Sequence, residues 1–175
     1  MERGRAHEKR SAFGARRSGK ARSALSLPLN YSKLYNYCMQ DSIFTKIIRG
    51  DIPSHKIYED ERTFAFLDID PLLPGHVLVV PKNQVDHIDD LPDQDYQALM
   101  ATVKKLARHL KNVLNKRRSA LLVMGYDVPH VHVHILPSDD GKSIYAAMGE
   151  RVDSNRQPAE PDHAALSALA KKLML

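Results

Sequence analysis

Cysteine is almost absent from this chain: Cys38 is the only one among 175 residues. A single cysteine cannot form an internal disulfide, so the sequence argues against a small secreted scaffold and favours a reducing, cytoplasmic compartment. Long apolar runs are also missing, and the sequence therefore predicts no membrane-spanning helix. The hydrophobic content of 43% is ordinary for one globular domain with its own core.

Basic residues are concentrated at the N-terminus. Residues 1–38 hold nine Lys or Arg against two acids, whereas the rest of the chain holds 17 bases and 19 acids. We therefore predict a disordered basic leader over 1–38 and one domain over 39–175. A miscalled start before Met39 is the favoured explanation, and a mitochondrial transit segment or a basic arm are the alternatives. The acidic balance of the domain predicts no specific nucleic-acid surface.

The periodicity of the apolar residues predicts an antiparallel α+β fold, because close strands alternate with only a few helices. The apolar spacing predicts a short N-terminal helix, a long central helix and a C-terminal helix, together with about five strands. The helices are expected over 42–49, 93–114 and 161–173, the strands over 56–59, 63–69, 76–81, 120–124 and 130–136, and a loop over 138–160.

Three histidines, His130, His132 and His134, alternate with Val131 and Val133 in one predicted strand. Alternate side chains of a strand point to the same face, at a spacing of about 6.6 Å. Histidine titrates near pH 6.5 in model peptides, so such a row suits proton transfer, nucleophilic attack or metal ligation.

A metal site that uses all three histidines fits this spacing poorly. His130 and His134 would lie about 13 Å apart on a straight strand, which zinc–nitrogen bonds of about 2.1 Å cannot span. A zinc site formed by two of the three remains the alternative. Covalent chemistry uses the whole row: the middle imidazole attacks an electrophile such as phosphorus, and a neighbour protonates the leaving group.

The segment from His130 to Leu136 resembles the signature of the histidine triad (HIT) family of nucleotide hydrolases. Three upstream blocks, over 42–53, 64–71 and 74–82, resemble that family in the same order. The resemblance implies a HIT-like fold with the long helix packed on the sheet, no cofactor and a homodimer. It also implies that His132 is the nucleophile, that His134 acts on the leaving group, and that His130 shapes the site.

The resemblance extends to the substrate-binding residues. His76 matches a fourth histidine beside the triad, and Asp68 matches the acid that binds the ribose hydroxyls. The base pocket would be formed by five apolar side chains: Phe44, Ile47, Ile52, Phe66 and Ile69. Transferase branches carry glutamine at the place of His134, so the histidine here favours hydrolysis.

Asp127 departs from the family pattern, because many members carry a phosphate-binding hydroxyl in the loop before the triad. A carboxylate near phosphate is repulsive unless it is turned away or paired.

The resemblance as a whole predicts cleavage at the α-phosphorus of a purine nucleotide conjugate, either a nucleoside phosphoramidate or a dinucleoside polyphosphate. A catalytically idle nucleotide-binding regulator is a further alternative.

Overall fold

The structure, a computed structural model, describes residues 40–151 and 160–175. The predicted leader over 1–38 lies outside these residues, so the domain division stays a prediction. The first half of the fold contains α2 (Ile43–Arg49), β1 (Lys56–Glu59), β2 (Thr63–Leu67), β3 (Val77–Pro81) and the short 3-10 helix η1 (Ile88–Asp90). The second half contains α3 (Asp93–Val113), β4 (Arg118–Leu122), β5 (Val133–Ser138), α4 (Gly141–Arg151) and α5 (His163–Leu173).

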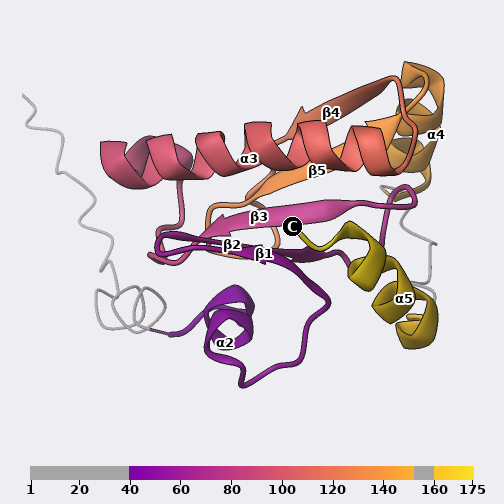
Figure 1. The fold of residues 1–175 in the computed structure, drawn as a ribbon. Helices are drawn as coiled ribbons and strands as arrows, with labels where there is room; N and C mark the ends of the chain where they lie inside the picture. Colours follow the sequence, from indigo (N-terminus) through magenta and orange to yellow (C-terminus); the bar gives the residue numbers. More distant parts are fainter. Residues whose placement is uncertain (1–39, 152–159) are drawn as a thin grey trace, which may run out of the picture. The chain divides into compact units, whose positions relative to one another are not determined.

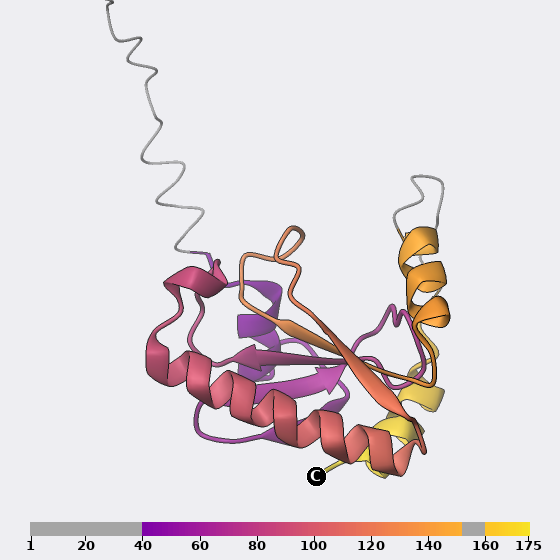
Figure 2. The same cartoon turned by 90° about the horizontal axis from the view of Figure 1, so that it is seen from above.

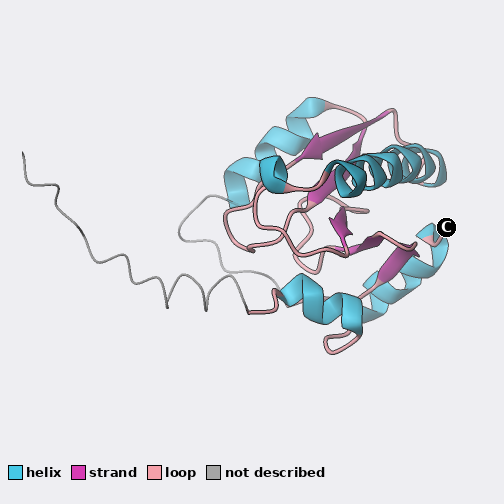
Figure 3. Cartoon of the chain, turned by 90° about the vertical axis from the view of Figure 1, so that its left-hand side faces the viewer, coloured by secondary structure: helices cyan, strands magenta, loops and turns pink. Residues whose placement is uncertain are grey.

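The five strands form one antiparallel sheet in the order β1-β2-β3-β5-β4. Strand β5 lies between β3 and β4, so His134 sits in the middle of the sheet, paired with Leu78 on one side and Leu122 on the other. This confirms the predicted α+β fold. Helices α3 and α2 lie on opposite sides of the strands (Figure 1), and the helices surround the sheet (Figure 3).

Strict alternation along the strands divides the apolar residues between two clusters. Ala65 and Leu67, Val77 and Val79, and Val133 and Ile135 face the main core under α3 and α5, which also contains Leu99, Val103, Leu106, Leu110, Ala170 and Leu173. The long helix α3 crosses this face of the sheet (Figure 2). The neighbours Phe64, Phe66, Leu78 and Val80 face the other way and pack with Phe44 of α2. His134 belongs to this second face.

The N-terminal helix begins and ends as the sequence predicts. Ser42 is the N-cap of α2, and its side chain accepts a hydrogen bond from the Thr45 amide. Gly50 ends the helix in the left-handed conformation at φ 85°.

Three expectations are wrong in detail. Strand β5 begins at Val133, so His130 and His132 precede it and only His134 lies within it. Residues 141–151 form α4, although a loop was expected; this helix has no buried residue, so its sequence lacks an apolar stripe. Strand β4 covers Arg118–Leu122, although the strand was expected over 120–124.

No helix in residues 40–151 or 160–175 is long and apolar enough to cross a membrane.

Candidate active site

Four histidines that are far apart in the sequence meet on the α2 side of the sheet. The His132 and His134 ring centroids lie 4.9 Å apart, and those of His76 and His134 lie 5.1 Å apart. His130 lies at the entrance to β5, and all four residues are buried. The structure therefore brings together every histidine that the sequence placed in the site.

One ring nitrogen of His132 is held by a hydrogen bond, and the other makes none within the described residues. Its Nδ1 lies 2.7 Å from the carbonyl oxygen of His130. A carbonyl oxygen can only accept, so Nδ1 carries the proton and Nε2 carries the lone pair. The edge of the Phe44 ring packs against this imidazole, with centroids 5.1 Å apart and planes at 74°. This hydrogen bond selects the tautomer that a nucleophile requires, with the proton on Nδ1 and the lone pair on Nε2.

His130 is fixed from both sides and is fully buried. Its Nε2 lies 2.8 Å from the carbonyl oxygen of Pro81, so Nε2 donates. Its Nδ1 lies 2.8 Å from Ser42 Oγ and therefore accepts from that hydroxyl. Burial is the main cause that lowers the pKa of His130, and the Pro81 carbonyl opposes it. With both nitrogens occupied, His130 positions the carbonyl that orients His132.

Sequence reasoning assigned no role in the site to Ser42 or Gln84. Gln84 Oε1 accepts from the Ser42 amide at 2.9 Å and also from the Thr45 hydroxyl. Only the N-cap pattern pointed to Ser42, and nothing in the sequence connected it to His130, which is 88 residues away.

His76 and His134 are joined by a hydrogen bond whose direction can be assigned. The backbone N–H of Leu72 donates to His76 Nδ1 at 3.2 Å, so this nitrogen is unprotonated. His76 Nε2 then carries the proton and donates to His134 Nδ1 at 2.8 Å. His134 must consequently carry its own proton on Nε2. That atom is the one buried side-chain nitrogen or oxygen without a hydrogen-bond partner in residues 40–151 and 160–175.

Both of these imidazoles are neutral at ordinary pH. Burial is the largest cause that lowers the pKa of His76 to about 3, and the neighbouring His134 and Arg151 act in the same direction. Burial also leads the lowering of the His134 pKa to about 4, followed by His132 and Arg151. Low-dielectric surroundings disfavour the charged form of each ring.

Asp68 directly follows β2 and lies beside His76, with its Oδ2 3.2 Å from His76 Nδ1. Its Oδ1 accepts from the Asp70 amide at 2.9 Å. Burial raises the pKa of the Asp68 carboxyl, and this amide hydrogen bond opposes the rise.

Within residues 40–151 and 160–175, one group of three side chains could hold a metal ion. Ligand-type atoms of Asp68, His76 and His134 lie within 4.8 Å of one another. Both nitrogens of His76 are engaged in hydrogen bonds, so a cation would have to displace them. His130 has both nitrogens occupied as well. The occupied nitrogens therefore count against His76 and His130 as zinc ligands.

The five predicted base-pocket residues are only partly brought together. Phe44 and Phe66 form one buried cluster, against which Ile47 packs. Ile47 and Ile52 border a surface hollow of about 280 Å³ between α2 and β2. Ile69 lies instead with Asp68 and His76 in a larger cavity of about 480 Å³.

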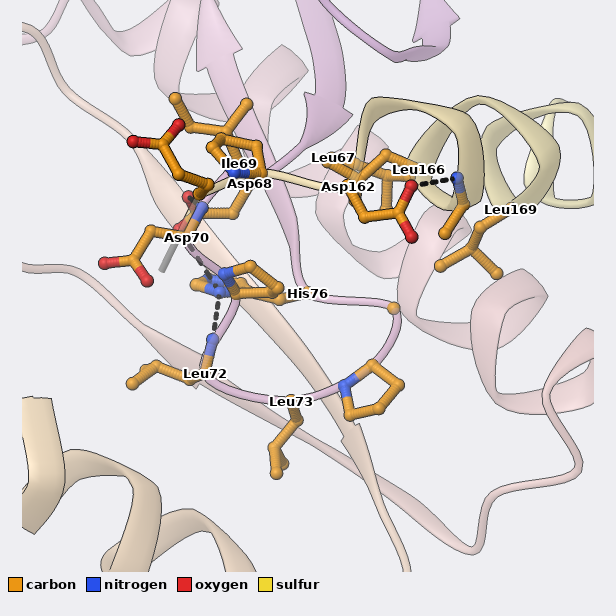
Figure 4. A pocket seen from close by; sticks show the side chains of 16 residues that line it. Leu67, Asp68, Ile69, Asp70, Leu72, Leu73, His76, Asp162, Leu166 and Leu169 are labelled. Carbon is orange, nitrogen blue, oxygen red and sulfur yellow. Dashed lines mark hydrogen bonds and ion pairs between the residues drawn. The ribbon is translucent and has the colours of Figure 1, made fainter. Parts of the chain in front are cut away.

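The larger cavity lies between the β2–β3 loop and α5 (Figure 4). Its walls are mostly apolar, with Leu72 and Leu73 from the loop and Leu166 and Leu169 from α5. Asp68 and His76 supply polar groups at its boundary. The contribution of α5 could not be read from the sequence, because helical periodicity does not show which loop a helix faces.

Two charged residues, Asp127 and Arg151, affect how the site could contact a substrate phosphate. Asp127, whose position raised doubt, is exposed in the bend before the triad. Arg151 at the end of α4 donates to the Asp70 carbonyl at 2.7 Å and lies 3.1 Å from its carboxylate. Its positive charge acts on Asp68, His76 and His134. Sequence reasoning missed Arg151 because it expected a loop there.

Comparison with known proteins shows the family to which this chain is similar. The family described as "HIT domain" matches residues 49–141, just over half of the chain. The protein named Protein hit from Bacillus subtilis is 33% identical over 145 residues, 78% of this chain and 97% of that protein. An adenosine 5'-monophosphoramidase of Saccharomyces cerevisiae is 38% identical over 102 residues, 58% of this chain and 65% of that protein.

The solved structures give the same result for the fold. A HIT-like protein involved in cell-cycle regulation from Bartonella henselae has a TM-score of 0.62 and 28% sequence identity. The match covers 76% of this chain and 94% of that chain.

Proposed function

Because this chain belongs to the HIT family, we propose that it is a nucleotide hydrolase that cleaves purine nucleotide conjugates at the α-phosphorus. The reaction proceeds through a covalent nucleotidyl intermediate on His132. The observation that carries this proposal is the 2.7 Å hydrogen bond from His132 Nδ1 to the His130 carbonyl, which leaves Nε2 as a free lone pair beside His134.

The first step forms a bond between His132 Nε2 and the α-phosphorus and breaks the bond from phosphorus to the leaving group. The His130 carbonyl stabilises the positive charge that develops on the ring, because it accepts the Nδ1 proton. In the second step, water attacks the phosphorus and His132 leaves as a neutral imidazole. His134 lies beside the reacting ring and exchanges the proton with the leaving group and then with water.

Nucleoside phosphoramidates are the favoured substrate class, with dinucleoside polyphosphates second. The name of the yeast relative supports the first class, because that protein is an adenosine 5'-monophosphoramidase. Asp68 and Ile69 line the same cavity, which supports their predicted contacts with the ribose and the base.

Mass spectrometry of the intact protein tests the covalent step. Wild-type protein quenched during turnover of an adenosine 5'-phosphoramidate should gain one adenylyl group, mapped by peptide analysis to His132. The His132→Ala variant should form no adduct and lose turnover, and the variant His87→Gln, at an exposed histidine, serves as the matched control. Absence of an adduct from wild type, with the nucleotide bound but uncleaved, would support the idle regulator instead.

We also propose that the protein is a homodimer formed through β4. This strand is at the edge of the sheet, so one side of its backbone pairs with no strand among the described residues. Leu121, Val123 and Met124 are exposed on and just after it. Light scattering after size exclusion should give twice the chain mass, and Leu121→Lys should shift the protein toward monomer. A wild-type monomer at micromolar concentration would contradict this proposal.

The cytoplasm is the compartment that we propose for this activity. Import into mitochondria is the alternative if residues 1–38 act as a transit segment, and mapping the mature N-terminus distinguishes the two.

A further inference from the structure

We propose that Gln84 is a positioning residue for the nucleophile His132, because it sets the hydrogen bonds that fix the backbone carbonyl to which His132 is bonded. This inference rests on the proposed function and extends it to a side chain outside the histidine cluster. Within residues 40–151 and 160–175, Gln84 makes no hydrogen bond to the His132 ring. It acts through Ser42 and then through His130, whose carbonyl oxygen accepts the His132 Nδ1 proton at 2.7 Å.

Strand pairing does not hold the backbone that carries His132, because β5 begins one residue later. Two hydrogen bonds to the end of β3 and to the segment after it hold this backbone instead. The Val131 amide donates to the Val85 carbonyl at 2.7 Å. The His130 Nε2 donates to the Pro81 carbonyl at 2.8 Å. The orientation of His132 therefore depends on how this neighbouring segment is fixed.

Gln84 belongs to the segment after β3, and its side-chain amide can face only one way. Its Nε2 donates to the Gln40 carbonyl at 3.0 Å, and its Oε1 accepts from the Ser42 backbone amide at 2.9 Å. A carbonyl oxygen accepts and a backbone N–H donates, so the reversed amide would lose both bonds. The Oε1 of Gln84 is therefore directed at the start of α2.

The Gln84 oxygen also decides which hydroxyl group donates to His130. The Thr45 hydroxyl donates to Gln84 Oε1, so it has no proton left for His130. The Ser42 hydroxyl lies 2.8 Å from His130 Nδ1, whereas the Thr45 hydroxyl lies 3.5 Å from this nitrogen. Ser42 is thus the donor to Nδ1, and it selects the His130 tautomer whose Nε2 carries the proton.

The same glutamine fixes the helix that packs on the nucleophile. Gln84 holds the backbone amide of Ser42, the N-cap of α2, and Phe44 follows two residues later. The Phe44 ring packs edge-on against the His132 ring, with centroids 5.1 Å apart, and against the His130 ring, with centroids 5.9 Å apart. Ser42 and His130 are both buried, so a bond lost between them leaves an unsatisfied buried group. Loss of the Gln84 oxygen should therefore loosen both contacts that orient His132.

Three variants separate the oxygen of Gln84 from the bulk of its side chain. Gln84→Leu removes the acceptor and the donor at similar volume. Gln84→Glu keeps oxygen atoms that accept from the Ser42 amide and the Thr45 hydroxyl, and it loses only the donor. Gln94→Leu is the matched control, because Gln94 is an exposed glutamine at the start of α3.

Steady-state kinetics on adenosine 5'-phosphoramidate give the first test. Gln84→Leu should lower kcat by about tenfold to 10²-fold with KM nearly unchanged, because the nucleophile is misoriented while the nucleotide still binds. Gln84→Glu and Gln94→Leu should stay close to wild type. A rise in KM with kcat unchanged would place Gln84 in substrate binding and overturn the proposal. Wild-type kcat in Gln84→Leu, or the same loss of kcat in Gln84→Glu, would also overturn it.

The tautomer of His132 gives a second test, which a loss of stability alone would not change. ¹⁵N–¹H correlation spectra of the histidine side chains are recorded at about pH 8, where an ordinary histidine is neutral. Wild type should show His132 protonated on Nδ1 and unprotonated on Nε2, with its peaks assigned by their loss in His132→Ala. In Gln84→Leu the two nitrogen shifts of His132 should move closer together, because both tautomers are then populated. Unchanged His132 shifts in that variant would contradict the proposal.

Gln84→Asn covers the case in which Gln84→Leu fails to fold. It keeps a polar amide at this half-buried position, but the amide is one methylene too short to reach the Ser42 N–H. The His132 shifts should change in the same direction as in Gln84→Leu, and shifts identical to wild type would overturn the proposal. Failure of the proposed function is distinguishable, because the spectra need no turnover: the His132 shifts would respond to Gln84 in a protein that forms no adduct.

Discussion

Replacement of Ser42 by Ala should destabilise the fold more than the loss of a helix cap alone. The Ser42 hydroxyl accepts from the Thr45 amide at 3.0 Å as the N-cap of α2, and it donates to His130 Nδ1 at 2.8 Å. Loss of a cap costs about 1 kcal/mol. The fully buried His130 would also lose the donor to its Nδ1, which costs about 1–3 kcal/mol more. We therefore expect a total loss of about 2–4 kcal/mol in the free energy of unfolding.

Urea unfolding, followed by circular dichroism, measures this loss. Asp162→Ala is the matched control, because Asp162 caps α5 through the Ala165 amide at 2.9 Å in an exposed position. The control should lose about 1 kcal/mol. Ser42→Ala should also lower kcat, since His130 carries the carbonyl that orients His132. If Ser42→Ala costs no more than Asp162→Ala, the hydrogen bond to His130 does not stabilise the site.

The remaining predictions concern pH, backbone strain and metal. The folded-state pKa values of His76 and His134, about 3 and about 4, lie below the model-peptide value of 6.5, so the unfolded chain binds more protons in that range. Stability should therefore be complete above about pH 6.5 and fall toward pH 4, by at most about 1.4 kcal/mol per pH unit for each histidine, and His76→Gln should reduce the slope measured by urea unfolding. Gly75→Ala should lower the melting temperature more than Gly50→Ala, because both glycines have positive φ but a Cβ at Gly75 would lie 2.4 Å from Leu114 Cδ1, whereas Gly50 has open space. Treatment with EDTA should leave turnover unchanged, with zinc below stoichiometry by elemental analysis; stoichiometric zinc that activity requires would support the metal alternative.

The sheet could be predicted because its strands are either buried on both faces or alternate between apolar and polar residues. Val77 to Pro81 and Thr63 to Leu67 are buried throughout, and their β-branched and aromatic residues favour strands. The central and C-terminal helices were predicted from their apolar stripes, which pack against the same core in the structure. Local pattern and tertiary packing agree in these elements.

Prediction failed where local pattern and tertiary contacts diverge. The alternation of His130 to His134 suggested one strand, but His130 turns toward Ser42 and Pro81, and strand pairing begins only at Val133. Helix α4 buries no side chain and depends on polar contacts such as the cap from Asp140 to the Ser143 amide, which leave no periodic signal. The contribution of α5 to the larger cavity was missed for a similar reason. An apolar stripe shows that a helix packs, but it does not show which part of the fold the helix packs against.

The sequence alone determined which side chains could carry the chemistry. The spacing of His130, His132 and His134 indicated a histidine-based site, because the types and order of these residues are set by the chain itself. The resemblance to the HIT family added Asp68 and His76 and indicated nucleotide chemistry. Only the tertiary structure decided what each imidazole can do. His76 and His134 are 58 residues apart, and their mutual hydrogen bond assigns the proton of each ring. Tautomer and pKa depend on burial and on partners across the fold, and neither is encoded in local sequence.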